Sequence, residues 1–167
     1  MEQEIKVNSS DKATAYREFL PQLQALIEGE TSVVSVLANT AAALKQAFGF
    51  FWVGFYLVEG GELVLGPFQG SVACYRIKKG RGVCGTAWDQ ACTQVVPDVE
   101  QFPGHIACSS LSRSEIVVPI MSEGQVRAVL DIDSDQLATF NHVDRQYLEQ
   151  VAQLLAPLFC SNPIPHS

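Results

Sequence analysis

The chain has 167 residues, of which 47% are hydrophobic and 17% are charged, a composition that supports one folded domain with a substantial core and excludes a largely disordered chain. Eleven Lys and Arg against 18 Asp and Glu give a net charge of −7. Because the protein is acidic and its densest basic segment, 76–81, is short, nucleic-acid binding is not expected. The N-terminus lacks a secretory-signal layout, and the most apolar stretch, 48–58, is too short to cross a bilayer, so we expect a cytoplasmic protein away from membranes.

Two helices are predicted first along the chain. Ser10 or Asp11 is placed to cap a helix whose apolar residues recur at near-helical spacing up to residue 27. Pro21 lies inside this pattern and predicts a kink or a break. A second helix is predicted to begin at Thr31 or Ser32, to run to about Ala47 and to be ended by Gly49.

Strand signals follow the helices. Residues 51–58 are rich in aromatic and β-branched side chains, and Gly60-Gly61 is a hairpin signal before a partner strand over 62–68. Residues 74–77 are compatible with a third short strand.

The middle of the chain combines short elements with a long loop. A short helix is predicted over 83–90 and a strand over 93–96. Residues 97–114 then form a long irregular connection containing proline, glycine and serine. Loops of this length inside a compact domain are more often functional than accidental.

The last elements are a hairpin and a helix. Strands are predicted over 115–121 and 125–132, around Glu123-Gly124. Asn141, with Asp144 three residues later, resembles a capping box that opens a helix to about residue 159.

The element order predicts an α+β fold: a central antiparallel sheet of five or six strands, with two N-terminal helices and a C-terminal helix packed on one face. No internal repeat or linker divides the chain. We expect residues 1–9 to be a flexible N-terminus, 10–160 to form a single domain and 161–167 to form a tail.

The cysteines are the first candidates for chemistry. There are five, an odd number, and no Cys-x-x-Cys pair, so a structural metal site is not expected. Cys92 and Cys160 lie in apolar contexts near helix ends and are expected to be small buried hydrophobes. For Cys74 and Cys84 the alternative to a chemical role is likewise that they are small buried hydrophobes. Cys108 differs because it lies in the long polar loop, where backbone N–H groups can lower a thiol pKa and make it nucleophilic.

Acidic residues form a second candidate group. Asp131 and Asp133 are two apart on one strand and therefore share a face. A two-residue turn would place Glu115 opposite Ile132, on the wrong face, whereas a three-residue turn over 123–125 would place it opposite Asp133. Three gathered carboxyls would raise one another's pKa, which suits proton donation or ammonium binding. The alternative is that both aspartates merely end the strand.

A thiolate beside a protonated carboxyl has a natural reaction. A sulfoxide sulfur becomes electrophilic when its oxygen is hydrogen-bonded or protonated, and attack by cysteine releases a thioether and leaves sulfenic acid on the enzyme. A second cysteine then condenses with the sulfenic acid to a disulfide that an external dithiol can reduce.

Seven motifs support a family resemblance: Leu37-Ala38-Asn39-Thr40, Trp52-Val53-Gly54-Phe55-Tyr56, Gly66-Pro67-Phe68-Gln69-Gly70, Gly80-Arg81-Gly82-Val83-Cys84-Gly85, His105-Ile106-Ala107-Cys108, Ser114-Glu115-Ile116-Val117-Val118-Pro119 and Leu130-Asp131-Ile132-Asp133-Ser134. In this order and spacing they closely resemble the free methionine-(R)-sulfoxide reductases, which are built on a single GAF domain. The resemblance covers roughly Tyr16 to Leu155. It implies the GAF fold and a cytosolic enzyme that reduces free L-methionine (R)-S-oxide to L-methionine and is regenerated by thioredoxin.

The resemblance also implies roles for three cysteines. Cys108 matches the nucleophile that takes the sulfoxide oxygen, and Cys74 matches the cysteine that resolves the sulfenic acid as a disulfide. Cys84 matches a third family cysteine, with a role either in disulfide relay or in lining the pocket. Backbone N–H groups near Cys108 are candidates for binding the oxygen.

The remaining site residues follow from the same resemblance. Glu115, Asp131 and Asp133 match substrate-site carboxylates, of which one or two hold the free α-ammonium and Asp133 helps to polarise the S–O bond. Trp52 and Tyr56 lie four apart on one strand, and would wall the pocket for the methyl group.

Two other functions compete with a reductase. A GAF domain that senses a small ligand would use the cysteines only incidentally, and a thiol switch would form a Cys74–Cys108 disulfide without a dedicated substrate. For the reductase, no bound cofactor is expected, thioredoxin with NADPH and thioredoxin reductase is the external reductant, and a homodimer would suit the two N-terminal helices as its interface.

Overall fold

The computed structural model describes residues 4–9, 11–105, 108 and 110–160. Its elements are α1 Lys12–Ile27, α2 Val33–Phe48, β1 Trp52–Glu59, β2 Glu62–Gln69, β3 Arg76–Lys78, α3 Gly82–Gln90, β4 Gln94–Val96, the 3₁₀ turn η1 Val99–Gln101, β5 Ser114–Ser122, β6 Gln125–Ser134, α4 His142–Leu155 and the 3₁₀ turn η2 Ala156–Phe159. The predicted tail, 161–167, and the alternative cap Ser10 lie outside the described residues.

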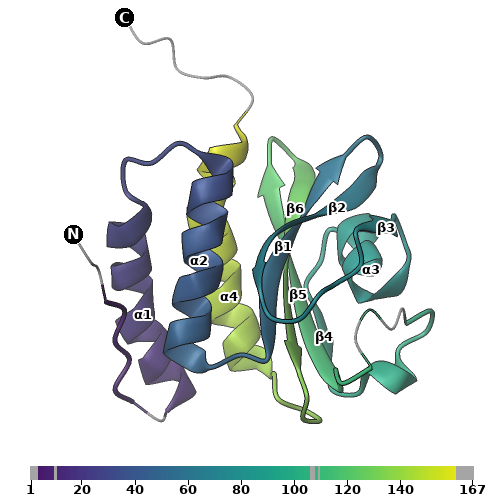
Figure 1. The fold of residues 1–167 in the computed structure, drawn as a ribbon, viewed down its shortest axis with the longest axis horizontal. Coiled ribbons are helices and arrows are strands. Elements are labelled where there is room, and N and C mark those ends of the chain that lie inside the picture. Colours follow the sequence, from purple (N-terminus) through teal and green to yellow (C-terminus); the bar gives the residue numbers. More distant parts are fainter. Residues whose placement is uncertain (1–3, 10, 106–107, 109, 161–167) are drawn as a thin grey trace, which may run out of the picture.

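The sheet is antiparallel throughout, with strand order β3-β2-β1-β6-β5-β4. Figure 1 shows α2 and α4 against one face of this sheet, α1 outside them, and α3 on the opposite face. The larger core lies on the side of the three long helices, and a second, smaller core lies under α3. The predicted α+β architecture is confirmed, and α3 adds a cover on the second face.

Caps define the helix ends. Ser32 accepts a hydrogen bond at the start of α2, and Gly49 ends that helix with φ 66°, a left-handed conformation that glycine adopts without strain. Asn141 and Asp144 form the predicted capping box of α4. The last predicted turn of that helix, 156–159, is a 3₁₀ turn.

The predicted break at Pro21 is wrong, because α1 runs from its Asp11 cap through the proline to its end. Proline deprives the preceding turn of one backbone donor. The missing donor would have bonded to the carbonyl of Arg17, so this turn has one backbone hydrogen bond fewer. Packing of α1 on α2 and α4 then stabilises the helix on both sides of the proline.

The β5–β6 hairpin places Glu115 opposite Asp133 by a different route from the one predicted. The turn has two residues, Glu123-Gly124, both with positive φ. A register shift after this turn leaves Arg127 as an extra residue on β6, a β-bulge that moves every later pair by one. The bulge, and not a three-residue turn, therefore puts the carboxyls on one face.

No helix among the described residues is long and apolar enough to span a membrane.

Candidate active site

Three neighbouring strands present the predicted site residues on the α3 side of the sheet. In the β1–β6 register Trp52 lies opposite Asp133, and in the β5–β6 register Glu115 lies opposite Asp133. Asp131 and Tyr56 follow at even spacings on their strands and therefore share this face. Sheet register alone thus brings together side chains from positions 52 to 133.

The aromatic pair is held by specific contacts. The Trp52 indole Nε1 donates to the Ser71 carbonyl at 2.9 Å, and its ring stacks on Phe68 with centroids 5.2 Å apart. The Tyr56 hydroxyl donates to the Cys74 carbonyl at 3.0 Å. Burial, and then the nearby carboxyls, raise the pKa of Tyr56, so its phenol stays neutral and keeps this hydrogen bond. Both rings therefore anchor the 71–74 segment over the sheet.

Two glycines make room for Trp52. A Cβ atom on Gly70, where φ is +142°, would lie 2.5 Å from the Trp52 Cδ1 atom. A Cβ atom on Gly54 would lie 2.3 Å from the Phe68 Cβ atom and 2.7 Å from the indole. Both glycines occur in the motifs noted above, but the sequence does not indicate that they serve the tryptophan.

Cys74 and Cys108 form a disulfide, with Cα atoms 5.4 Å apart across 34 residues of sequence. Cys84 is buried and carries a free thiol. The prediction that Cys92 and Cys160 are buried is wrong, since both are exposed. They directly follow the end of α3 and the last 3₁₀ turn, where the chain leaves the packed surface, so their apolar sequence neighbours do not determine their burial.

One cavity gathers these groups. It is lined by Trp52, Tyr56, Cys84, Cys108, Glu115, Asp131 and Asp133, which are all of the predicted site residues except Cys74. It is also lined by Arg81 and His105, which occur in two of the family motifs without an assigned role, and by Ser112, which occurs in none. Arg81 precedes α3, and the other two lie in the long connection that was predicted to be functional. The sequence signal for Arg81 and His105 is their place in these motifs, and that for Ser112 is its position in the long connection.

The carboxyls are buried together. Burial, and then the neighbouring charges of Asp131 and Asp133, raise the pKa of Glu115 well above its ordinary value. Burial, followed by the charge of Asp131, does the same to the pKa of Asp133. Burial also raises the pKa of Asp131, against hydrogen bonding that lowers it. At neutral pH the group therefore retains protons that exposed carboxyls would lose.

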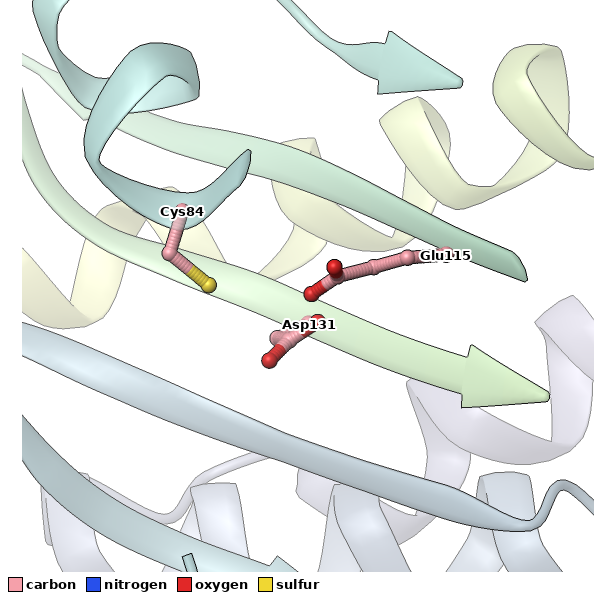
Figure 2. A group of neighbouring side chains, drawn as sticks. All are labelled: Cys84, Glu115 and Asp131. Carbon is pink, nitrogen blue, oxygen red and sulfur yellow. The ribbon is translucent and has the colours of Figure 1, made fainter. Parts of the chain in front are cut away.

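Cys84 belongs to the same group. Figure 2 shows its sulfur pointing towards the carboxyl groups of Glu115 and Asp131, and one ligand atom from each residue lies within 4.8 Å of the others. Burial, and then the Asp131 charge, raise the pKa of the Cys84 thiol, so it stays protonated. Asp131 Oδ1 is buried without a hydrogen-bond partner in the described part of the chain. A cation entering here, either a metal ion or an ammonium group, would satisfy that oxygen and relieve the repulsion.

A GAF-domain family model matches residues 30–159. The crystal structure of a free methionine-R-sulfoxide reductase from Neisseria meningitidis, in complex with its substrate, superposes with a TM-score of 0.92 at 56% identity, covering 93% of this chain and 95% of that one. The chain belongs to the free methionine-R-sulfoxide reductase family. The predicted family resemblance and GAF fold are thereby confirmed.

Two curated relatives are similar over most of the chain. The free methionine-R-sulfoxide reductase of Escherichia coli strain K12 is 49% identical over 146 residues, covering 86% of this chain and 88% of that protein. GAF domain-containing protein A of Dictyostelium discoideum is 55% identical over 156 residues, covering 93% and 99%. In this free methionine-R-sulfoxide reductase family member, the disulfide and the carboxyl group face one cavity, as disulfide-based reduction requires.

Proposed function

We propose that this chain reduces free L-methionine (R)-S-oxide to L-methionine, and that Cys108 is the nucleophile. The observation that supports this most directly is the Cys74–Cys108 disulfide at the edge of a cavity lined by three carboxyls. The disulfide is the expected end state of the enzyme after one turnover, and the carboxyls are the expected proton source. Membership of the family supplies the substrate class.

In the first step the Cys108 thiolate attacks the sulfoxide sulfur while its oxygen takes a proton. The S–O bond of the substrate breaks, methionine leaves, and the oxygen stays on Cys108 as sulfenic acid. The Cys74 thiol then attacks that sulfur and displaces water, which forms the disulfide. Overall, the sulfoxide accepts two electrons and two protons from the two thiols. Backbone N–H groups near Cys108 orient the oxygen.

Asp133 is assigned to polarise the S–O bond, since a carboxyl with a raised pKa keeps a proton to share at neutral pH. Glu115 and Asp131 are assigned to the substrate ammonium. The buried Oδ1 atom of Asp131, which lacks a partner among the described residues, supports this assignment. Trp52 and Tyr56 provide an aromatic wall for the methyl group, with ring centroids 6.3 Å apart.

Cys84 is assigned to lining the pocket and not to disulfide relay. Its thiol is buried, and its raised pKa keeps it out of the thiolate form that disulfide exchange needs. Substitution of Cys84 by alanine is accordingly expected to change substrate KM more than the rate of disulfide formation.

A site of this kind selects a free amino group. An N-acetylated substrate would bring an uncharged amide to buried carboxyls that need a cation, and such mismatches cost orders of magnitude in kcat/KM. N-acetylated, C-amidated methionine sulfoxide is therefore expected to be a poor substrate.

The proposed reaction also needs a reductant and a reducing compartment. Thioredoxin, supplied with electrons from NADPH through thioredoxin reductase, regenerates the dithiol, and no bound cofactor is needed. Residues 10–160 act as one catalytic domain in the cytoplasm, where thiols are kept reduced. A homodimer through α1 and α2 would cover Val34, an exposed apolar side chain on α2. Sedimentation equilibrium of wild type and Val34→Asp tests the dimer.

The chemistry is tested in a single turnover. Pre-reduced wild type, mixed with excess free methionine (R)-sulfoxide and no reductant, is expected to release one methionine per chain and to form the Cys74–Cys108 disulfide, both measured by mass spectrometry. Cys108→Ser should release none, and Cys92→Ser, at an exposed cysteine outside the cavity, should behave as wild type. Methionine release by Cys108→Ser would contradict the assignment of the nucleophile.

A further inference from the structure

Large apolar side chains are exposed at both ends of the disulfide. Val72, which is 88% exposed, and Tyr75, which is 80% exposed, lie on either side of Cys74 in the sequence, and Leu111, which is 64% exposed, follows Cys108 by three residues. The disulfide holds the Cα atoms of the two cysteines 5.4 Å apart, so these side chains belong to one region of the surface. They are three of the six large hydrophobic side chains that are exposed among the described residues.

The same region is basic in an acidic protein. Residues 70–88 contain Arg76, Lys78, Lys79 and Arg81 and no Asp or Glu, whereas the whole chain has a net charge of −7. Arg76 and Lys78 are the exposed positions of β3, which begins two residues after Cys74. Arg76 reaches Glu62 at 3.4 Å, but both side chains are partly exposed and the pair is weak. The basic residues lie on the Cys74 side of the region, whereas Leu111 lines a cavity together with Asp98, Glu100 and Asp135. An acidic partner would therefore be attracted to the Cys74 side.

The chemistry of the disulfide requires a partner. The established family reaction consumes two thiols in each turnover, so a dithiol must restore them. Cys108 lines the substrate cavity, whereas Cys74 does not. The side chains of Cys74 and Cys108 are both half-buried.

We infer that Tyr75, Leu111 and Val72, flanked by the basic residues of 76–81, form the docking surface for an acidic protein dithiol of the thioredoxin class. This rests on the proposed function. The partner's thiolate attacks Cys74 Sγ, the S–S bond breaks, and its electron pair leaves on Cys108 Sγ inside the cavity. The partner's second thiolate then attacks the sulfur of the partner's first cysteine in the mixed disulfide, and the Cys74 thiol is released. The partner becomes the disulfide, and this chain gains two electrons and two protons.

The surface explains why a protein reductant would be preferred over a small thiol. Apolar side chains around a half-buried disulfide contribute nothing to attack by a small dithiol, but they add contact area for a protein. The basic flank raises the association rate with an acidic partner, an effect that salt screens.

The test compares two reductants. Turnover of free methionine (R)-sulfoxide is measured with thioredoxin, NADPH and thioredoxin reductase, and separately with dithiothreitol, for wild type, Tyr75→Ser and Leu111→Ser. Val72 is left unchanged because it also lines the cavity. The Tyr75 carbonyl accepts a hydrogen bond from the Leu65 N–H, and this backbone interaction is kept when the side chain is substituted. Met121→Ser is the control, because Met121 is an exposed apolar side chain at the turn end of β5, away from the disulfide.

Tyr75→Ser and Leu111→Ser are each expected to lower kcat/KM for thioredoxin by roughly tenfold and to leave dithiothreitol turnover unchanged. Lys78→Glu is expected to lower kcat/KM for thioredoxin several-fold at low salt, whereas Lys6→Glu, at the N-terminal segment, should not. Wild-type kcat/KM for thioredoxin in both serine variants, or an equal loss with both reductants, would overturn the docking surface. No dithiothreitol turnover by wild type would instead overturn the proposed function.

Discussion

Glu115→Gln is expected to stabilise the folded protein at neutral pH while it lowers turnover. Burial beside Asp131 and Asp133 raises the pKa of Glu115 well above its ordinary value of 4.5, to which it returns on unfolding. Between these two pKa values the folded state holds a proton that the unfolded state has lost. The free energy of unfolding therefore falls as pH rises, by at most about 1.4 kcal/mol per pH unit for this group.

The sign and size follow from that difference in proton binding. The contribution of Glu115 to stability is fully present below its ordinary pKa and is lost as pH rises through the raised pKa. Between an ordinary value of 4.5 and pH 7 the loss has a ceiling of about 3 kcal/mol. Glutamine fills the same volume without a titrating proton, so the variant does not lose this stability. The site carboxyl is thus retained for chemistry at a cost in stability.

The assay is urea unfolding of the oxidised protein, with the Cys74–Cys108 disulfide intact, at about pH 5.5 and pH 7.5. Wild type should lose stability between the two pH values relative to Glu115→Gln. Glu30→Gln, at an exposed position, is the matched control and should follow wild type. Parallel pH profiles for wild type and Glu115→Gln would refute the reasoning.

Three other predictions follow from single contacts. Asp144→Ala, which leaves the buried Tyr16 hydroxyl without its 2.7 Å acceptor and removes a capping box, should lower the free energy of unfolding by about 3 kcal/mol in urea titrations. Gly70→Ala should displace Trp52, costing about 1–3 kcal/mol by thermal unfolding and raising KM for the sulfoxide; an unchanged KM would contradict the packing argument. Cys74→Ser should complete one turnover and stop as a sulfenic acid that dimedone labels, and steady turnover with thioredoxin would exclude Cys74 as the resolving cysteine.

Elements with strong local signals were predicted well from the sequence. The spacing of apolar residues and the caps at Asp11, Ser32 and Asn141 locate the long helices to within a few residues. Alternation in the last strand places Asp131 and Asp133 on one face. These features depend on residues that are close in sequence, and they can therefore be predicted without a structure.

Features that depend on tertiary packing were not predictable in the same way. The position of Glu115 is set by the bulge at Arg127, and no local pattern distinguishes a bulge from a longer turn. The helix continues through Pro21 because the surrounding helices pack on it, a tertiary effect that outweighs local propensity. The exposure of Cys92 reflects where the chain leaves α3, not the hydrophobicity of its neighbours.

The central claim, that Cys108 reduces one epimer of free methionine sulfoxide, is tested most directly by NADPH consumption. The assay contains thioredoxin, thioredoxin reductase and one purified epimer of free methionine sulfoxide, with wild type or Cys108→Ser. The account predicts consumption with the R epimer alone, and its complete loss in Cys108→Ser. Consumption with the S epimer, or undiminished consumption in Cys108→Ser, would contradict it.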